Sequence, residues 1–319
     1  MVVLSAIALL YFSLLASTVA NLNYTIFIDD YGTPHLIDLN EPEFTQAELE
    51  QIDESAQNTT FYLYTRKNPV IGQQLFIDDL DSVKKSFWNP DHPTRLVTHG
   101  WKGNSENPSC TQIRDAYLNV GDYNVILIDW REAAKYDWYW KSVRSVPFVS
   151  QRVASLIDFL ENNANLDPGK TTVIGHSMGA HVASLGARFA TSEIAEVVAT
   201  DPAGPAFESK PPGKRVDKSD AVLVQVIHTC AKYVGMKSAV GTSDFYPNGG
   251  IQQPGCGPID DSKATGCAHA RSYLYYVESI TNPTGFRAGD VFMGGPSLDP
   301  NARGTYILQT ASESPFALG

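Results

Sequence analysis

The chain has 319 residues, 43% of them hydrophobic and 18% charged, which is enough to bury one large core and excludes intrinsic disorder as its main state. Its 24 Lys and Arg residues against 35 Asp and Glu give a formal net charge of −11. An acidic surface of that size repels phosphate backbones, so nucleic acid is excluded as a partner.

The first twenty residues carry no charged side chain, and their apolar run over 2–16 is too short to cross a bilayer of about 30 Å comfortably. Small residues at Thr18 and Ala20 precede Asn21 in the pattern of a cleavage site. We therefore predict a signal peptide over 1–20 and a secreted, extracellular single domain over 21–319. An uncleaved anchor is the alternative.

Beyond an acidic stretch over 21–56 that we expect to be irregular, short apolar runs alternate with helical patterns, which is typical of an α/β fold. One helix is indicated by an apolar face from Val149 to Leu160, ended by residues 162–168. A second begins after Ser177, and its small residues Ala180, Ala183 and Gly186 form a thin side that we expect to lie close against the sheet. Runs rich in branched residues predict buried strands over 61–64, 95–98, 123–128, 171–174, 194–200 and 222–227.

Four cysteines in an exported chain favour disulfides over free thiols or zinc, and four cysteines allow three pairings. Cys256 and Cys267 enclose only ten residues, so we expect them to staple a small loop. Cys110 and Cys230 then pair by elimination. The tripeptides beginning at Asn23 and Asn58 are glycosylation sequons that suit the same compartment.

The most informative segment is G-H-S-M-G at 175–179, which sets G-x-S-x-G between a predicted strand and a predicted helix. A serine held on so sharp a turn crowds the backbone, which explains the glycines two residues before and after it. Ser177 is the predicted nucleophile, and the backbone N–H of Met178 is a predicted donor to the developing oxyanion.

A serine nucleophile needs a histidine base and a carboxylate that orients it, in the chain order Ser, Asp or Glu, His. Asp201 follows an apolar strand pattern and opens a turn, so it is the predicted carboxylate. Only His228 and His269 lie beyond it. We favour His269, which we expect in a loop after Cys267, as the base, and we expect His228 to be structural.

The strand over 95–98 ends in His99, Gly100 and Trp101, a loop of the kind that supplies the second oxyanion donor. The Trp101 N–H is the predicted donor, and an ordinary strand-ending turn is the alternative. His99 and His176 match no metal spacing, so neither a metal nor any other cofactor is expected. The aromatic run from Trp130 to Trp140 is open to two interpretations, a lipid headgroup boundary or internal packing.

Six blocks lie along the sequence: T-H-G-W at 98–101, V-I-L-I-D-W at 125–130, G-H-S-M-G-A-H at 175–181, D-P-A-G-P-A-F at 201–207, D-F-Y-P-N-G-G at 244–250 and C-A-H-A-R-S at 267–272. Together they resemble the pancreatic-type neutral lipase family, including its secreted phospholipase A1 branch. The resemblance implies an α/β-hydrolase fold, hydrolysis of glycerolipid acyl esters without a cofactor, a triad of Ser177, Asp201 and His269, and a lid formed by the loop between Cys256 and Cys267.

Two departures from the triacylglycerol lipases of that family shape the expected function. The sequence ends at Gly319, before the C-terminal β-sandwich of the larger members, so no colipase is expected, and the lid is only ten residues long. A short lid leaves the site open, as in phospholipase A1. We therefore expect a phospholipase A1 acting at a membrane, lipid-droplet or micelle surface; the alternatives are a triacylglycerol lipase and a catalytically silent, yolk-type lipid-binding member.

Overall fold

The computed structural model describes residues 23–258 and 261–319, so the predicted signal peptide over 1–20 lies outside the described residues. Within those two ranges no helix has both the length and the apolar character needed to cross a bilayer.

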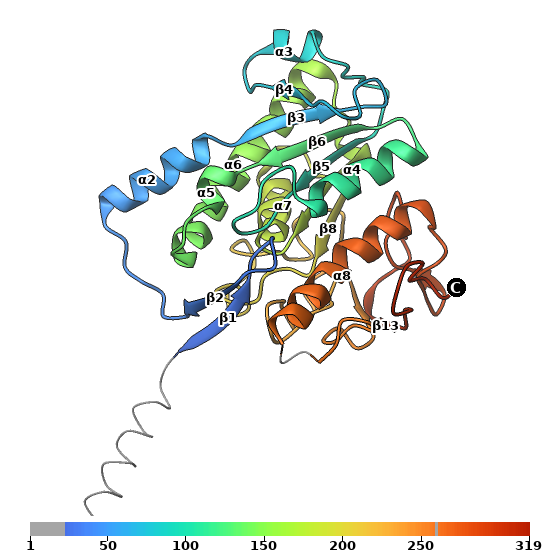
Figure 1. Ribbon diagram of the computed structural model, residues 1–319. Helices are drawn as coiled ribbons and strands as arrows, with labels where there is room; N and C mark the ends of the chain where they lie inside the picture. The colour runs from blue at the N-terminus through green and yellow to red at the C-terminus, as the bar shows by residue number, and fades with distance from the viewer. Residues whose placement is uncertain (1–22, 259–260) are drawn as a thin grey trace, which may run out of the picture.

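A nine-stranded sheet runs through the centre of the described chain, in the order β13-β10-β9-β8-β7-β5-β6-β3-β4 (Figure 1). Strands β5 to β10 and β13 run parallel, whereas β3 and β4 are antiparallel at one edge. The strands are β3 (Thr60–Tyr64), β4 (Gln73–Leu75), β5 (Thr94–Thr98), β6 (Asn124–Asp129), β7 (Thr171–His176), β8 (Glu196–Thr200), β9 (Leu223–Ile227), β10 (Ser243–Pro247) and β13 (Gly304–Leu308), with a short ribbon of β11 (Arg287–Ala288) and β12 (Val291–Phe292) beside them.

Helices cover both faces of the sheet (Figure 1). The pair α4 and α8 packs on one face and the pair α6 and α7 on the other, each over its own hydrophobic cluster. The helices are α2 (Gln46–Gln57), α3 (Leu80–Lys84), α4 (Pro108–Val120), α5 (Arg131–Ala134), α6 (Tyr139–Ala164), α7 (Met178–Phe189) and α8 (Ser262–Thr281), with a 3-10 turn at Pro168–Lys170.

The α/β prediction is confirmed, and the six predicted strands correspond to β3, β5, β6, β7, β8 and β9. Every residue of β5, β6 and β7 is buried, because a parallel strand with helices on both faces has no solvent-facing side. This is why these strands appear in the sequence as continuous apolar runs.

The two predicted helices are also present, with different details. Helix α6 begins at Tyr139, ten residues before the apolar face seen in the sequence. The earlier turns are hidden in the sequence because Pro147, a residue that usually breaks helices, lies among them. The helix ends where Asn165 takes the left-handed conformation. In α7 the thin side at Gly186 faces α6 rather than the sheet, since a Cβ there would lie 2.8 Å from Val153 Cγ1.

The prediction of an irregular segment over 21–56 is wrong. Strands β1 (Tyr24–Ile28) and β2 (Pro34–Asp38) form a hairpin in which Ile26 pairs with Leu36, and α2 follows with a capping box between Thr45 and Glu48. The hairpin buries Phe27, Ile28 and Ile37, so its order depends on the rest of the protein. Each strand has only five residues, and the acidic and turn-forming residues at 29–33 between them hide the hairpin in the sequence.

One of the two predicted disulfides is present. Cys256 and Cys267 are bonded, whereas Cys110 and Cys230 are free and buried, which corrects their pairing by elimination. The reason is their location: Cys110 lies on α4 in one hydrophobic cluster and Cys230 follows β9 in the other. The sequon residues Asn23 and Asn58 are exposed, and their glycosylation stays a prediction.

The aromatic run between β6 and α6 is mainly part of the core. Trp130, Tyr139 and Trp140 are buried, and Trp138 is exposed and packs against Phe44. Of the two interpretations, internal packing describes this run.

Candidate active site

The predicted nucleophile lies on a sharp strand-to-helix turn. Strand β7 ends at His176, α7 begins at Met178, and Ser177 between them has φ 58° and ψ −125°, a conformation that costs energy for any residue with a side chain. A Cβ on Gly175 would lie 2.2 Å from Gly179 O, and one on Gly179 the same distance from His99 O. Both glycines are therefore required by close backbone contacts, as the sequence pattern predicts.

Asp201 lies at the carboxyl end of β8, next to the turn that carries Ser177. Its side chain is fully buried, and its Oδ1 accepts hydrogen bonds from Thr229 N (2.8 Å) and Cys230 N (3.0 Å). Two backbone donors on one oxygen fix the carboxylate in place. The other oxygen, Oδ2, is left to bind a side chain.

That side chain is His269, whose Nδ1 lies 2.5 Å from Asp201 Oδ2. His269 belongs to the second turn of α8, not to a loop before it as the sequence pattern suggests, so its position is set by a packed helix. Its Nε2 is buried and has no hydrogen-bond partner in the described part of the chain. Because Nδ1 donates to the carboxylate, Nε2 carries a free lone pair that can accept a proton.

Backbone contacts bring Ser177 to this pair. Ser177 N donates to Thr200 O, the residue before Asp201, and Ser177 O accepts from Ala203 N, both within 3.1 Å. His176, the residue before the serine, lies with its ring 4.4 Å from the ring of His269. Burial, and then the neighbouring His269, hold the pKa of His176 well below its usual value, so a neutral ring lies beside the predicted base.

The alternative histidine, His228, has no free nitrogen. Its Nε2 lies 2.9 Å from Asp244 Oδ1 and its Nδ1 lies 2.9 Å from Met236 O. A ring bonded at both nitrogens has no lone pair for a serine proton, which agrees with a structural role.

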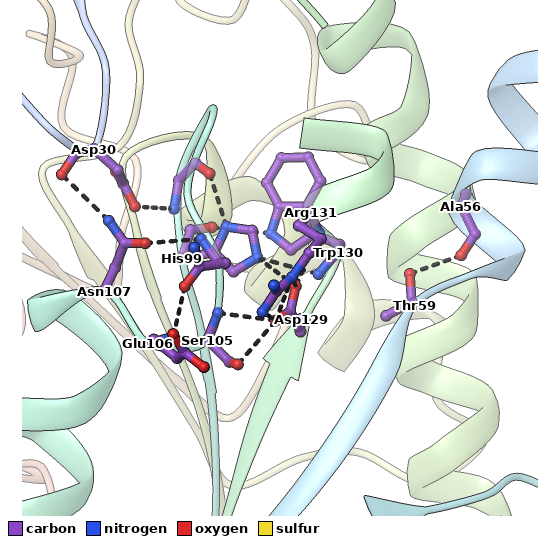
Figure 2. Close-up of polar contacts among 12 residues, drawn as sticks. Asp30, Ala56, Thr59, His99, Ser105, Glu106, Asn107, Asp129, Trp130 and Arg131 are labelled. Carbon is purple, nitrogen blue, oxygen red and sulfur yellow. Dashed lines mark hydrogen bonds and ion pairs between the residues drawn. The ribbon is translucent and has the colours of Figure 1, made fainter. Parts of the chain in front are cut away.

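The loop after β5 contains the predicted second oxyanion donor. His99 stacks on Trp130 with ring centroids 5.2 Å apart, accepts a hydrogen bond from Trp130 N at Nε2, and lies with Nδ1 2.9 Å from Gly100 O (Figure 2). Since Nε2 accepts, Nδ1 carries the proton and donates to Gly100 O. Among the described residues, neither Trp101 N–H nor Met178 N–H has a hydrogen-bond acceptor, so both are available.

Asp129, the last residue of β6, is hydrogen-bonded to the segment that follows Gly103. It accepts from Ser105 N and Oγ, and Arg131 Nε lies 3.0 Å from it (Figure 2). Although its burial acts in the opposite direction, hydrogen bonds from Arg131 hold the pKa of Asp129 well below its usual range. The charge of Asp129 therefore serves the loop rather than the serine.

Sequence reasoning missed the element that covers the site, the β1–β2 hairpin. Ser177 is only 1% exposed. The Phe27 ring lies 6.3 Å from the His269 ring, and a cavity of about 220 Å³ beside His269 is lined by the tip of the hairpin, including Asp30. The short run of aromatic and branched residues at 24–28 is a signal that could have indicated a strand here.

No group of three or more metal-binding side chains occurs in residues 23–258 and 261–319. The chemistry available at the site is that of a serine, a histidine, a carboxylate and two backbone N–H groups. This set suits nucleophilic attack on a carbonyl carbon, with proton transfer by the histidine and stabilisation of the oxyanion by the amides.

Comparison with known proteins gives the family. Residues 36–291 match the Lipase family. The chain belongs to the lipase family. It is 36% identical over 253 residues to pancreatic triacylglycerol lipase from Cavia porcellus, covering 73% of this chain and 54% of that protein. It is also 36% identical over 248 residues to pancreatic lipase-related protein 2 from Myocastor coypus, covering 72% and 53%.

This lipase-family chain thus spans about half the length of the curated relatives it matches. Among solved structures, an α/β hydrolase from a Medee basin deep-sea metagenome library overlaps 67% of this chain and 73% of its own, at 17% identity and a TM-score of 0.33. The α/β-hydrolase fold is apparent from the chain itself, in its mixed central sheet flanked by helices and its nucleophile turn.

The loop between Cys256 and Cys267 is only partly a loop in this lipase-family chain. Its second half, from Ser262, is the first turn of α8, and residues 259–260 lie outside the described residues. Gly266 in this turn approaches Ile28 of the hairpin, since a Cβ there would lie 3.3 Å from Ile28 Cγ2. The stapled segment and the hairpin therefore meet over the site.

Proposed function

We propose that the chain hydrolyses acyl esters of glycerolipids through Ser177, His269 and Asp201. The observation that carries the proposal is the unpartnered, buried Nε2 of His269, whose other nitrogen is held by Asp201, at the same sheet edge as the serine turn. Membership of the lipase family supports an ester of a lipid as the substrate.

The reaction proceeds in two halves. Ser177 Oγ attacks the ester carbonyl carbon while His269 Nε2 takes its proton, and the N–H groups of Trp101 and Met178 receive the oxyanion. His269 then returns the proton to the leaving alcohol, which leaves an acyl-enzyme. A water molecule attacks this second ester in the same way, and the fatty acid departs with Ser177 restored.

The test is the Ser177→Ala variant, assayed with a short-chain ester and with lipid. We expect turnover to fall by up to about 10⁶-fold with the thermal midpoint unchanged. Ser155→Ala, a serine on α6 that donates only to Gln151 O, is the matched control. Retained hydrolysis in Ser177→Ala would overturn the proposal.

Labelling with a fluorophosphonate separates this function from that of a silent, yolk-type lipid-binding protein. A working serine reacts with the probe, and Ser177→Ala does not. A folded wild-type protein that neither reacts with the probe nor releases fatty acid would support the binding function instead.

Among glycerolipids, we favour phospholipid, cleaved as by a phospholipase A1. A cavity of about 520 Å³ beside the turn after Asp201 is lined by Gly204, Lys232, Lys237 and others. Lys232 and Lys237 are exposed, and their ammonium groups make no ion pair or hydrogen bond with the described residues. Such free cations can bind a phosphate, which triacylglycerol lacks.

The names of the relatives, pancreatic triacylglycerol lipase above all, favour triacylglycerol as the alternative substrate. Release of fatty acid from phosphatidylcholine and from triolein decides between them. With Lys232→Gln and Lys237→Gln combined, we expect the phospholipid rate to fall several-fold and the triolein rate to stay. Equal changes in both would count against a phosphate site.

The outer face of the β1–β2 hairpin supports contact with a lipid surface. Tyr24, Ile26 and Leu36 are 45%, 58% and 74% exposed, and Ile26 and Leu36 are a cross-strand pair. Apolar side chains on the element that covers the site would face the lipid when substrate enters. Replacement of Ile26 and Leu36 by Ser should weaken binding to phosphatidylcholine vesicles without changing hydrolysis of a soluble ester.

We also propose that the protein is exported, with cleavage after Ala20. The apolar pattern over 2–16 and the Cys256–Cys267 bond support this, because an oxidising compartment favours disulfides. Expression of the full chain in a eukaryotic host tests it: a secreted protein that begins at Asn21 is expected, and retention in the cell membrane would support an anchor.

A further inference from the structure

We propose that Asp30, at the tip of the β1–β2 hairpin, is a positioning residue that holds the loop from His99 to Gly103 so that Trp101 N–H points to the reacting carbonyl oxygen. This rests on the proposed function, because it assigns a role within the same ester hydrolysis. Asp30 is 71 residues before Trp101 in the chain and no sequence pattern links the two.

Two hydrogen bonds from Asp30 bracket the Trp101 amide group. Gly100 N donates to Asp30 Oδ2 at 2.7 Å, and Asp30 N donates to Trp101 O at 3.3 Å. Trp101 N–H lies between these two fixed groups and, among the described residues, has no acceptor of its own. Gly100 O, the carbonyl of the same peptide group, accepts from His99 Nδ1 and Gly103 N. Asp30 adds a hydrogen bond on each side of this peptide group and so completes the set that fixes the direction of the N–H.

The loop is shaped to admit the carboxylate. A Cβ on Gly100 would lie 2.4 Å from Asp30 Oδ1 and 2.9 Å from Ser177 Cβ, and a Cβ on Gly103 would lie 2.5 Å from Asp30 Oδ2. The carboxylate and the nucleophile therefore flank the same glycine. A side chain at either glycine would push Asp30 away.

Asp30 is itself held from two sides. Asn107, the first residue before α4, donates from Nδ2 to Asp30 O at 3.3 Å (Figure 2). On the hairpin, Asp29 Oδ1 accepts from Tyr31 N and Thr33 N, which closes the turn that presents Asp30. Thus Asp29 stabilises the turn of the hairpin, and Asp30 contacts the loop from His99 to Gly103.

The charge of Asp30 is set by the groups around it. Burial raises its pKa to about 6, while His99 in the loop, Gly100 N–H and His269 on α8 act in the opposite direction and Asp29 adds to the rise. Tyr273 on α8 and Cys110 on α4 also face the carboxyl group. The ionised carboxylate is the stronger acceptor for Gly100 N–H, so protonation of Asp30 below about pH 6 weakens the hydrogen bond between them.

The experiment compares Asp30→Ala, Asp30→Asn and a control, Tyr31→Phe, on a water-soluble short-chain ester. Tyr31→Phe removes only the bond from Asn104 Nδ2 to the Tyr31 hydroxyl on the same hairpin tip. Loss of a whole oxyanion donor costs about 10²–10³ in kcat. We expect Asp30→Ala to lose roughly 10–100-fold in kcat with KM within about 3-fold, because a misdirected donor retains part of its effect.

Two readouts separate positioning from a merely structural role. Asp30→Asn keeps an acceptor oxygen without the charge, so at neutral pH its kcat should lie between that of Asp30→Ala and that of the wild type. The wild type and Tyr31→Phe keep the Asp30 carboxyl group, which Asp30→Asn lacks, so the kcat of these two proteins should fall more steeply below pH 6 than that of Asp30→Asn.

A kcat for Asp30→Ala equal to that of Tyr31→Phe would overturn the inference, as would an effect on KM alone. So would a loss no larger than the drop in active sites titrated with a fluorophosphonate. If Asp30→Ala does not fold, Asp30→Asn with an acid limb identical to the wild type overturns it. Active Ser177→Ala would instead defeat the proposed function, whereas inactive Ser177→Ala with normal Asp30→Ala defeats only this inference.

Discussion

Two buried histidine–carboxylate pairs near the carboxyl edge of the sheet lie within hydrogen-bond distance, and they differ in what the second ring nitrogen contacts. In His269–Asp201 the second ring nitrogen has no partner in the described chain, whereas in His228–Asp244 it is bonded to Met236 O. Asp244 in turn accepts from Val240 N and Gly241 N, so the second pair fastens a loop.

The comparison shows that a histidine beside an aspartate is insufficient evidence for a base. What distinguishes the catalytic candidate is a nitrogen that remains available, at the sheet edge where the serine turn lies. The following variants test whether the two pairs divide chemistry and stability in this way.

The largest effect should follow from His269→Ala. Removal of the base is expected to lower kcat by about 10⁴–10⁶-fold, with most of the stability retained, because Asp201 keeps its two backbone donors. Kinetics with a soluble ester and a thermal melt measure the two quantities. A fall in stability with kcat largely intact would assign the chemistry elsewhere.

The reverse is expected for His228→Ala. Loss of the ring leaves Met236 O without its donor and removes one partner of a buried pair, which should cost about 3 kcal/mol in the free energy of unfolding. Per folded molecule, kcat should change by less than about 3-fold. Urea denaturation with active-site titration checks this; a large loss of kcat in folded protein would make both pairs functional.

A third histidine, His181, has no carboxylate partner among the described residues, and the pH dependence of stability distinguishes it from the two pairs. Val216 N donates to its Nδ1, Ala203 O faces its Nε2, and burial lowers its pKa to about 3. Between that value and the unfolded value of about 6.5, the unfolded chain binds more protons, so stability falls as the pH falls.

From pH 7 to pH 5 this one group should remove about 2 kcal/mol. His181→Gln should therefore lose less stability over that interval than the wild type. The pKa of Asp30 is raised to about 6, so its protonation stabilises both folded proteins equally as the pH falls. The difference between their urea midpoints therefore isolates the contribution of His181. Parallel curves would mean that His181 binds its proton as readily in the folded protein as in the unfolded chain.

The smallest effect concerns the cysteines, where the pairing expected from elimination was wrong. Free, buried thiols at Cys110 and Cys230 should each cost about 1 kcal/mol when changed to Ala, and the double variant should show the sum. If the two were bonded, each single change would cost as much as the double. Denaturation curves of the three variants distinguish these outcomes.

Much of the fold follows from local pattern. The runs at 123–128 and 171–174 predicted strands that are buried on both faces. The G-x-S-x-G pattern predicted a turn in which a side chain at either glycine would clash with a nearby backbone carbonyl group. These features succeed because the constraint lies within a few residues of the pattern. The hairpin at 24–38 fails the same approach, since its apolar positions are ordered by contacts with Trp101 and Tyr139 far along the chain.

The candidate site divides along the same line. Chain order identified Ser177, Asp201 and His269 as candidates, because the α/β scaffold places successive strand ends at one edge. The sequence by itself thus determined the sheet, the serine turn and the chemical groups near it, all of which depend on short-range sterics and on strand order. Only the tertiary structure decided which histidine keeps a free nitrogen, which cysteines meet, and that Asp30 reaches Gly100, because these depend on packing between segments that the chain separates by tens of residues.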